Sequence, residues 1–338
     1  YVEAVALARR GLQAAQSFQE PARLGIQMKL MSVIVMARRP INERLPLTAD
    51  LADMVERARI AGIAKTAALG AHLIAVLNEE ASDYRQAADF TIRSAELSRG
   101  ADRTTAAYSI ANTARCLLFL QREVPKAEAL LAEAQASGID CAELALGWGY
   151  LHAHQGRGEE ARPHFEHAIE LAHRDRDHWR EWVAVARLTT MALEEGRPDV
   201  ALRECERLGP LATKMKGGSE PARTAMLSAL SHYLAGEETD LGTPLAGLRA
   251  IDSKSDLAWA LAFLAEIESG QGHRDAAHAH AAEALEAAEI VGRDSDAAIA
   301  RAILGRHAGT PNTNDLTARA QKFIKEKDHG HPRTGADV

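Results

Sequence analysis

Histidine is the enriched titratable residue type whose spacing could support metal binding. The chain contains 14 histidines, and a cluster of them lies between residues 152 and 178: His152, His154, His164, His167, His173 and His178. His164 and His167 are three positions apart, a spacing that places two ligands on one helix face. No cysteine or carboxylate completes a convincing ligand set, and no HExxH pattern occurs. We therefore expect a solvated helix face, with no metal and no cofactor.

Carboxylate pairs and nucleotide-binding loops are the other features that could support catalysis. The adjacent carboxylates all lie at expected helix ends or turns: Glu79/Glu80, Glu159/Glu160 and Glu194/Glu195. Solvation and helix capping explain acids at such places. Neither a GxxxxGK[ST] loop nor a GxGxxG fingerprint occurs, and no strand is expected that would give such a loop its context. Since no Ser/His/Asp or Cys/His set can be proposed from spacing, we expect no enzyme activity in this chain.

Composition narrows the class of protein and its partners. The formal net charge of -7 gives no general electrostatic reason to bind nucleic acid directly. The three cysteines, Cys116, Cys141 and Cys205, lack CxxC spacing and indicate reduced residues of a cytoplasmic protein. The most apolar run, residues 28–37, is about half the length that a membrane span needs. We therefore expect a cytoplasmic protein with no membrane partner.

The elements that must position these residues are indicated by a repeating triplet of small or apolar residues at i, i+4 and i+7. Successive triplets begin 34 to 47 residues apart, at Ala4, Leu51, Ala88, Ala127, Ala161, Ala201, Leu241 and Ala277. Self-similarity at such a period is typical of stacked helix pairs. The low aromatic content of 4% is consistent with helices that approach closely through alanine.

The most complete repeat covers residues 139–175. A helix is expected over residues 142–155, a turn at Gly156-Arg157-Gly158, and a returning helix over residues 159–172. Similar turns begin at Gly196, Gly236 and Gly272. Glycine ends the first helix where positive φ is needed, and a following acidic residue suits the N terminus of the second helix.

On these residues the chain resembles the tetratricopeptide repeat family. That family places small residues at the positions of Gly149, Ala161 and Ala168, and an aromatic at that of Phe165, because the two helices cross there. The match is good over residues 139–175, fair over 73–136 and 178–208, and degenerate over 221–248. The resemblance implies an all-α fold, a right-handed superhelical solenoid of about seven or eight antiparallel helix hairpins.

The repeats also predict the domain organisation. Residues 1–18 are expected to be the second helix of a truncated first repeat, which indicates a fragment of a longer polypeptide. Residues 19–309 are expected to form the helical repeats, with a loop or hinge at 209–221, where GPLATKMKGGSEP concentrates helix breakers. A capping helix is expected over 310–328 and a disordered tail over 329–338.

In this family the first helix of each pair lines a concave wall. Counting from the triplets, the residues expected on that wall to bind a partner are Asn112, Phe119, Tyr150, His154, Met226, Tyr233, Trp259 and Glu266, with Cys116 beside them. The family's Lys/Asn carboxylate clamp is absent. Trp179 and Trp182 are three positions apart among arginines, so they either mark a partner contact or lie in a hairpin interface.

We therefore expect a non-catalytic interaction and sensing module that binds a protein or peptide partner on its concave face, with a small-molecule effector as a further candidate. The alanine-rich repeats also resemble the C-terminal solenoids of bacterial signal-transduction ATPases and of transcription activators related to the maltose-regulon activator. That resemblance implies control of a separate effector domain. The alternatives are a small-ligand or peptide-pheromone sensor of a transcription regulator and, less favoured, a helical enzyme with a closed polar pocket.

Overall fold

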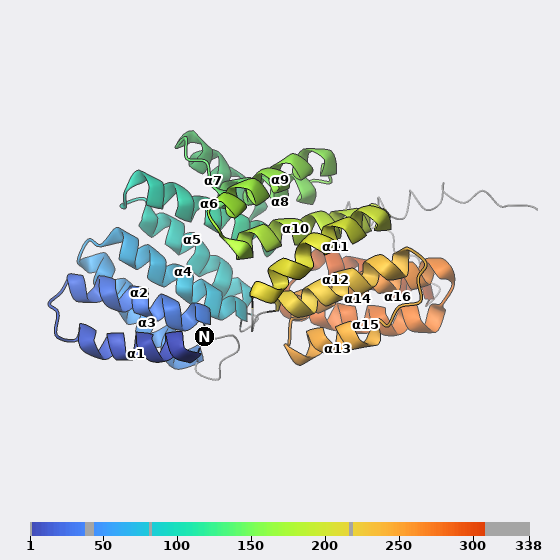
Figure 1. Ribbon diagram of the computed structural model, residues 1–338, viewed down its shortest axis with the longest axis horizontal. Helices are drawn as coiled ribbons and strands as arrows, with labels where there is room; N and C mark the ends of the chain where they lie inside the picture. Colours follow the sequence, from blue (N-terminus) through green and yellow to red (C-terminus); the bar gives the residue numbers. More distant parts are fainter. Residues whose placement is uncertain (1, 38–43, 81–82, 216–218, 308–338) are drawn as a thin grey trace, which may run out of the picture. The chain divides into compact units, whose positions relative to one another are not determined.

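The described part of the protein is entirely helical. The computed structural model describes residues 2–37, 44–80, 83–215 and 219–307. Sixteen α-helices and no strand occur within these ranges (Figure 1). The helices pack against their neighbours along the chain, which confirms the predicted all-α fold of stacked helices. The right-handed superhelix remains a prediction.

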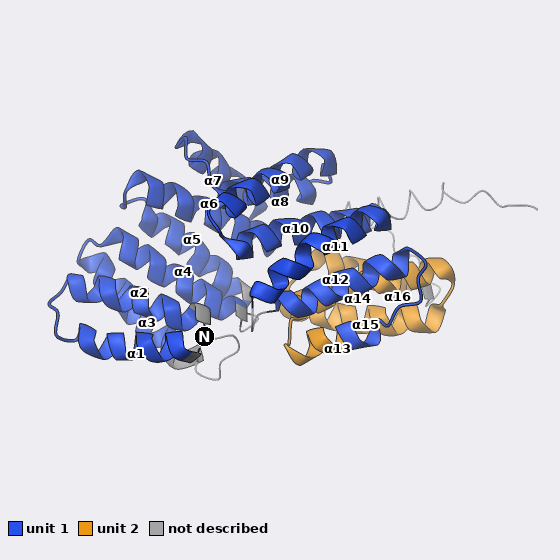
Figure 2. Ribbon diagram, viewed as in Figure 1, with its two compact units in different colours: residues 1–244 blue, residues 245–338 orange. Residues whose placement is uncertain are grey.

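The chain divides into two compact units, residues 1–244 and residues 245–338 (Figure 2). The first unit contains α1 (Val2–Ala15), α2 (Ala22–Ala37), α3 (Arg44–Ile60), α4 (Ala64–Glu80), α5 (Tyr84–Ser98), α6 (Arg103–Phe119), α7 (Val124–Ala136), α8 (Ala142–His154), α9 (Gly158–Arg174), α10 (His178–Glu194), α11 (Pro198–Lys214) and α12 (Glu220–Leu234). α13 (Gly242–Ala250) crosses the boundary, and the second unit continues with α14 (Lys254–Gln271), α15 (Arg274–Val291) and α16 (Asp294–His307).

Even-numbered helices are the first helices of the pairs, and they form the inner layer of the packing. In the first unit α2 contacts α4, α6 contacts α8, and α10 contacts both α8 and α12; in the second unit α14 contacts α16. α2, α4, α6, α8, α10 and α14 each also pack against the second helix of their own pair. Nine of the 13 residues of α8 are buried, against six of the 17 residues of α9. A first helix is thus enclosed by neighbours, whereas a second helix keeps one polar face.

The predicted glycine turns are confirmed. Gly156, Gly196, Gly236 and Gly272 follow α8, α10, α12 and α14, and their φ values lie between 68° and 85°. This left-handed region is accessible to glycine without the steric cost that a Cβ atom brings. The turn reverses the chain so that the second helix can return along the first.

Close approach within the repeats depends on glycine at two positions of α8. A Cβ atom on Gly149 would lie 2.7 Å from Cε1 of Phe165 in α9. A Cβ atom on Gly147 would lie 2.4 Å from Cδ2 of Leu131 in α7. Phe165 itself is fully buried. The crossing that the repeat resemblance implied for Gly149 and Phe165 is therefore a real contact.

This crossing predicts opposite effects for two glycine substitutions. Gly149→Ala should lower the free energy of unfolding by about 1 to 2 kcal/mol, because the overpacking cost exceeds the gain in helix propensity. Gly25→Ala in α2, where the added Cβ would meet only Oγ1 of Thr66 at an ordinary contact distance of 3.8 Å, should raise it by about 0.5 to 1 kcal/mol. Urea denaturation followed by circular dichroism measures both. Shifts of the same sign would contradict this account of the crossing.

The predicted loop at 209–221 is wrong over its first half. α11 continues through Gly209 and Pro210 to Lys214, and α12 begins at Glu220. The apolar stripe of α11 continues past the breakers, since Leu208, Leu211 and Ala212 are all buried. Their burial offsets the hydrogen bond that Pro210 removes. Residues 216–218 lie outside the described residues.

The predicted ends of the chain are only partly described. α1 covers most of the segment 1–18 that was expected to be helical. α16 ends at His307, so the predicted capping helix at 310–328 and the predicted tail at 329–338 lie outside the described residues.

Candidate functional site

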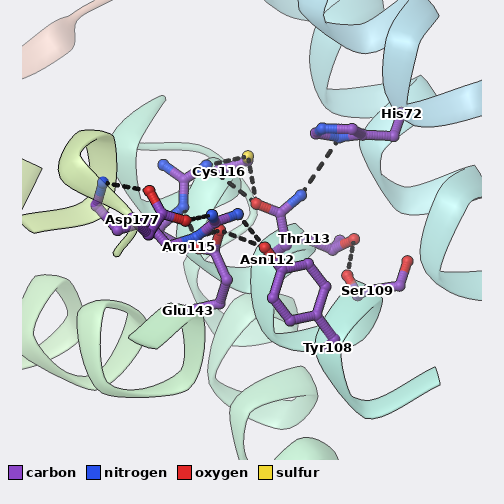
Figure 3. Close-up of polar contacts among 10 residues, drawn as sticks. His72, Tyr108, Ser109, Asn112, Thr113, Arg115, Cys116, Glu143 and Asp177 are labelled. Atoms are coloured by element: carbon purple, nitrogen blue, oxygen red, sulfur yellow. Dashed lines mark hydrogen bonds and ion pairs between the residues drawn. The ribbon is translucent and has the colours of Figure 1, made fainter. Parts of the chain in front are cut away.

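A cluster of polar and aromatic side chains lies on the first helices of the first unit (Figure 3). We call it the wall cluster, and its members come from α4, α6, α8 and α10 and from the residue that caps α10: His72, Tyr108, Asn112, Arg115, Glu143, Asp177, Trp179 and Arg180. Its central group is the buried carboxylate of Glu143, and Nε1 of Trp179 donates to a second buried carboxylate, Glu220 of α12, at 3.0 Å.

Glu143 lies in the first turn of α8 with a side chain that is 0% exposed. Its Oε2 accepts a hydrogen bond from Nε of Arg115 at 2.7 Å, and its Oε1 accepts one from Nε of Arg180. The Tyr108 hydroxyl lies 3.4 Å from Oε1. Burial alone would raise the pKa of Glu143, but the two arginines outweigh it and hold this pKa below its usual value. Glu143 therefore stays ionised between two cations.

The two arginines connect Glu143 to neighbouring first helices. Arg180 also donates to the carboxylate of Asp177 and to the hydroxyl of Tyr108 in α6. Arg115 donates through Nη2 to Oδ1 of Asn112 at 3.0 Å. Both guanidinium groups lie near the Trp179 ring, with Cζ to centroid distances of 5.3 Å for Arg115 and 5.9 Å for Arg180. α6, α8 and α10 are thereby joined by charge-assisted hydrogen bonds and cation–π contacts.

Local structure explains why these groups meet. Asp177 is the N-cap of α10, where its Oδ1 accepts from the backbone N–H of Arg180 at 3.0 Å. This cap places Trp179 and Arg180 in the first turn of α10. Glu143 occupies the first turn of α8, where the positive end of the helix dipole favours an acid. The cluster therefore joins the N-terminal ends of α8 and α10 to the middle and C-terminal half of α6.

Three buried groups, His72 and Tyr108 of the cluster and the neighbouring Cys116, have pKa values displaced away from neutral pH. Burial lowers the pKa of His72 to about 4, aided by the nearby charge of Arg115. Burial also raises the pKa of the Cys116 thiol to about 12 and raises that of the Tyr108 phenol. His72 is neutral and lies 3.3 Å from the Asn112 amide through Nδ1. At neutral pH the imidazole, phenol and thiol are therefore uncharged.

Further arginine–aromatic pairs continue this surface toward α12. The Cζ of Arg187 lies 5.3 Å from the Tyr150 ring centroid, and that of Arg223 lies 5.6 Å from the Trp182 ring centroid. Nε1 of Trp182 donates to Oγ1 of Thr224 at 2.9 Å. We call the residues of these pairs, together with Tyr108, Arg115, Trp179 and Arg180, the arginine–aromatic band. It runs over α6, α8, α10 and α12.

The residues expected on the wall divide by exposure. Asn112, Tyr150, Met226 and Trp259 are buried; Phe119, Tyr233 and Glu266 are half-buried; His154 is exposed at the end of α8. Asn112 belongs to the wall cluster through Arg115. Of the expected set, Phe119 and Tyr150 meet edge to face at 6.4 Å between ring centroids.

The other expected residues are not part of the wall cluster. Met226 and Tyr233 lie on α12 of the first unit. Trp259 and Glu266 lie on α14 of the second unit, where Trp259 stacks on Phe263 at 5.4 Å. Partner binding by this set remains a prediction.

Sequence reasoning missed Arg115, Glu143 and Arg180. A usable signal existed, because Glu143 interrupts an otherwise apolar stretch of α8 and its two partners stand on the neighbouring first helices. The two tryptophans that the sequence assigned either to a partner contact or to a hairpin interface differ in burial. Trp182 is 3% exposed and lies between first helices, whereas Trp179 is half-buried beside the arginines.

The histidines and paired glutamates that drew attention in the sequence lie mostly in ion pairs at helix ends and turns. In the part of the chain that the structure describes, no group of three His, Cys, Asp or Glu side chains could hold a metal ion. Glu160 pairs with Arg157 at 2.7 Å and Glu195 with Arg162 at 2.9 Å. These acids form ion pairs at the hairpin turns.

Comparisons with known proteins give no relative for this chain. No protein-family model matches it, and no curated protein matches it significantly. The tetratricopeptide repeat family therefore remains a resemblance. None of the described helices combines the length and apolar character that crossing a membrane requires.

Proposed function

We propose that this protein is a non-catalytic interaction and sensing module of the tetratricopeptide type, which binds a protein or peptide partner on the first helices of its first unit. The observation that carries the proposal is the arginine–aromatic band. In this proposal the module acts in the cytoplasm within a larger bacterial signalling or regulatory protein and controls a separate effector domain.

The residue types of the band support partner binding. Tyrosine, tryptophan and arginine dominate the residues whose truncation costs most at protein interfaces. Tyr108 is 39% exposed, and Arg180, Arg187 and Arg223 are half-buried. Partly exposed guanidinium groups and aromatic rings on adjacent helices can contact backbone carbonyls and acidic side chains of an extended segment.

The buried carboxylate supports the proposal through preorganisation. Glu143 and Asp177 hold Arg180 in one orientation, and Trp179 packs beside it. An arginine that is already fixed loses less conformational entropy when a partner binds. The wall cluster can therefore serve as a rigid platform as well as a support for the fold.

One contact favours a second candidate, a sensor that closes around a short peptide or small ligand. The Tyr108 hydroxyl of α6 accepts a hydrogen bond from Arg180 of α10, although the α8–α9 pair stands between these helices in the chain. First helices of non-adjacent pairs thus meet across the wall. A ligand that inserts between them would change this contact directly.

A selection from a phage-displayed random peptide library tests the wall assignment. Peptides selected on the wild-type chain should bind Tyr108→Ala and Arg223→Ala about 10-fold or more weakly, because hot-spot truncations cost about 2 kcal/mol. Arg203→Ala is the matched control, since Arg203 is 66% exposed on α11 and belongs to no wall contact. Fluorescence anisotropy with the selected peptides measures the affinities. If only the Arg203 variant weakens binding, the partner site lies on the second helices.

A further inference from the structure

A pocket opens beside the turn between α7 and α8. It lies in the first unit between the end of α7, the α7–α8 turn, α8 and α9, and has a volume of about 320 Å³. Leu144 and Trp148 of α8 line its interior, and His164 and His167 line its α9 side. Asp140 of the turn lies at its rim. This volume is at the lower end of the range for small-molecule sites.

The pocket contains a set of nearly parallel rings. Trp148 and His164 are inclined by 27° with centroids 6.4 Å apart, and His152 stacks on His164 at 5.1 Å with planes only 8° apart. Burial lowers the pKa of both histidines, so both rings are neutral at pH 7. Neutral parallel rings offer a π surface on which another flat ring can stack.

The rim of the pocket carries an acid next to a histidine. Nε2 of His167 lies 3.0 Å from both carboxylate oxygens of Asp140, whose side chain is 62% exposed. Glu170 lies 3.6 Å from Nδ1 of the same histidine. Two carboxylates therefore stand near the entrance, while Arg103 of α6 donates to the backbone carbonyl of Ser137 in the same turn.

Between two other pairs of successive second helices, an arginine–glutamate ion pair occupies the place that His167 has here. The repeat position of His167, one residue before the third triplet member, is Glu133 in α7 and Glu283 in α15. Each of those glutamates accepts two hydrogen bonds from an arginine, Arg99 at 2.8 and 2.7 Å and Arg249 at 2.7 and 2.6 Å. The end of α7 carries Gln135, Ala136, Ser137 and Gly138 and supplies no such arginine. Between α7 and α9 the carboxylate comes instead from Asp140 of the α7–α8 turn, and α7 itself contains no arginine.

We propose that this pocket binds a small planar aromatic amine, with its ring stacked on Trp148 and His164 and its ammonium group at Asp140. The flat rings select an aromatic body, and the rim carboxylate selects a positive charge. The assignment is independent of partner binding on the first helices, because no residue that lines the pocket belongs to the arginine–aromatic band. The protein would then receive a small-molecule signal beside the α7–α8 turn.

Isothermal titration calorimetry with tryptamine tests this site on the whole chain. A ligand of this size should bind at one site with a dissociation constant on the order of 1 mM or lower. Indole-3-acetate has the same ring and the opposite charge, and it should bind about 10-fold more weakly. Tighter binding of indole-3-acetate, or no saturable heat with tryptamine, overturns the proposal.

Two variants and one control test whether tryptamine binds in this pocket. Asp140→Asn should weaken tryptamine binding about threefold by removing the exposed charge, and His164→Ala should weaken it about fivefold by removing a stacking ring. Asp199→Asn changes an acid that is 71% exposed on α11 and should leave the affinity unchanged. Circular dichroism checks that each variant is folded. Equal affinities for wild type and both pocket variants would place tryptamine elsewhere and overturn the assignment.

Discussion

Glu143→Ala is expected to lower the free energy of unfolding by about 3 to 5 kcal/mol, because it leaves two buried or half-buried cations without their shared counter-ion. Arg115 is 8% exposed and cannot turn toward water without leaving its place beside Trp179. Arg180 would keep its ion pair with Asp177 but lose its ion pair with Glu143 of α8. Chemical denaturation followed by circular dichroism measures the change.

Glu133→Ala is the matched control, since Glu133 also accepts two hydrogen bonds from an arginine but is 41% exposed. Its loss should cost about 1 kcal/mol or less. Acid titration gives a second readout. Because the pKa of Glu143 is lowered in the folded protein, its stabilisation is present above the ordinary pKa of a glutamate in the unfolded chain, near 4.5, and is lost as pH falls through the lower pKa of the folded protein. Equal losses for the two glutamates would show that burial of Glu143 is unimportant.

Phe165→Ala is expected to lower the free energy of unfolding by about 3 to 5 kcal/mol. Phe165 is fully buried at the α8–α9 crossing, against Gly149 and edge to face with Tyr150 at 5.6 Å. Removing the ring leaves a cavity, because the two helices are held by turns and neighbouring pairs and cannot close it. Thermal and urea denaturation measure the loss.

Phe18→Ala provides the control for this substitution. Phe18 follows α1 and is 51% exposed, so its truncation removes little buried area. The change in the free energy of unfolding should stay within about 0.5 kcal/mol. A Phe165 variant as stable as the Phe18 variant would mean that the α8–α9 hairpin is packed differently.

Local features of the sequence predicted the repeat units well. Gly156 and Gly272 end first helices because positive φ is needed there, and a glycine is readable without tertiary information. The triplets around Phe165 and Ala168 indicated the buried stripe of a second helix for the same reason. The loop at 209–221 was predicted wrongly because tertiary burial of Leu211 and Ala212 outweighs the breakers Gly209 and Pro210.

The wall cluster could not be predicted from the repeat period alone. Arg115 and Glu143 are 28 residues apart, and Tyr108 and Arg180 are 72 apart. Whether they meet is set by the rotation between successive helix pairs, which small changes in packing alter. The period could therefore place polar residues on first helices, but it could not show that two arginines and a tyrosine converge on the carboxylate of Glu143.

The bond between Tyr108 of α6 and Arg180 of α10 passes over the intervening α8–α9 pair. In a stack held only by adjacent contacts, one pair can melt while the others persist. The Tyr108–Arg180 bond joins two helix pairs that are not adjacent in the chain, and it disfavours melting of the α8–α9 pair alone. Such melting would also remove Glu143, which holds Arg180 in place. The segment from α6 to α11 should therefore unfold and refold as one cooperative unit. The extent of this unit is set by a few charged contacts and not by the length of the repeat.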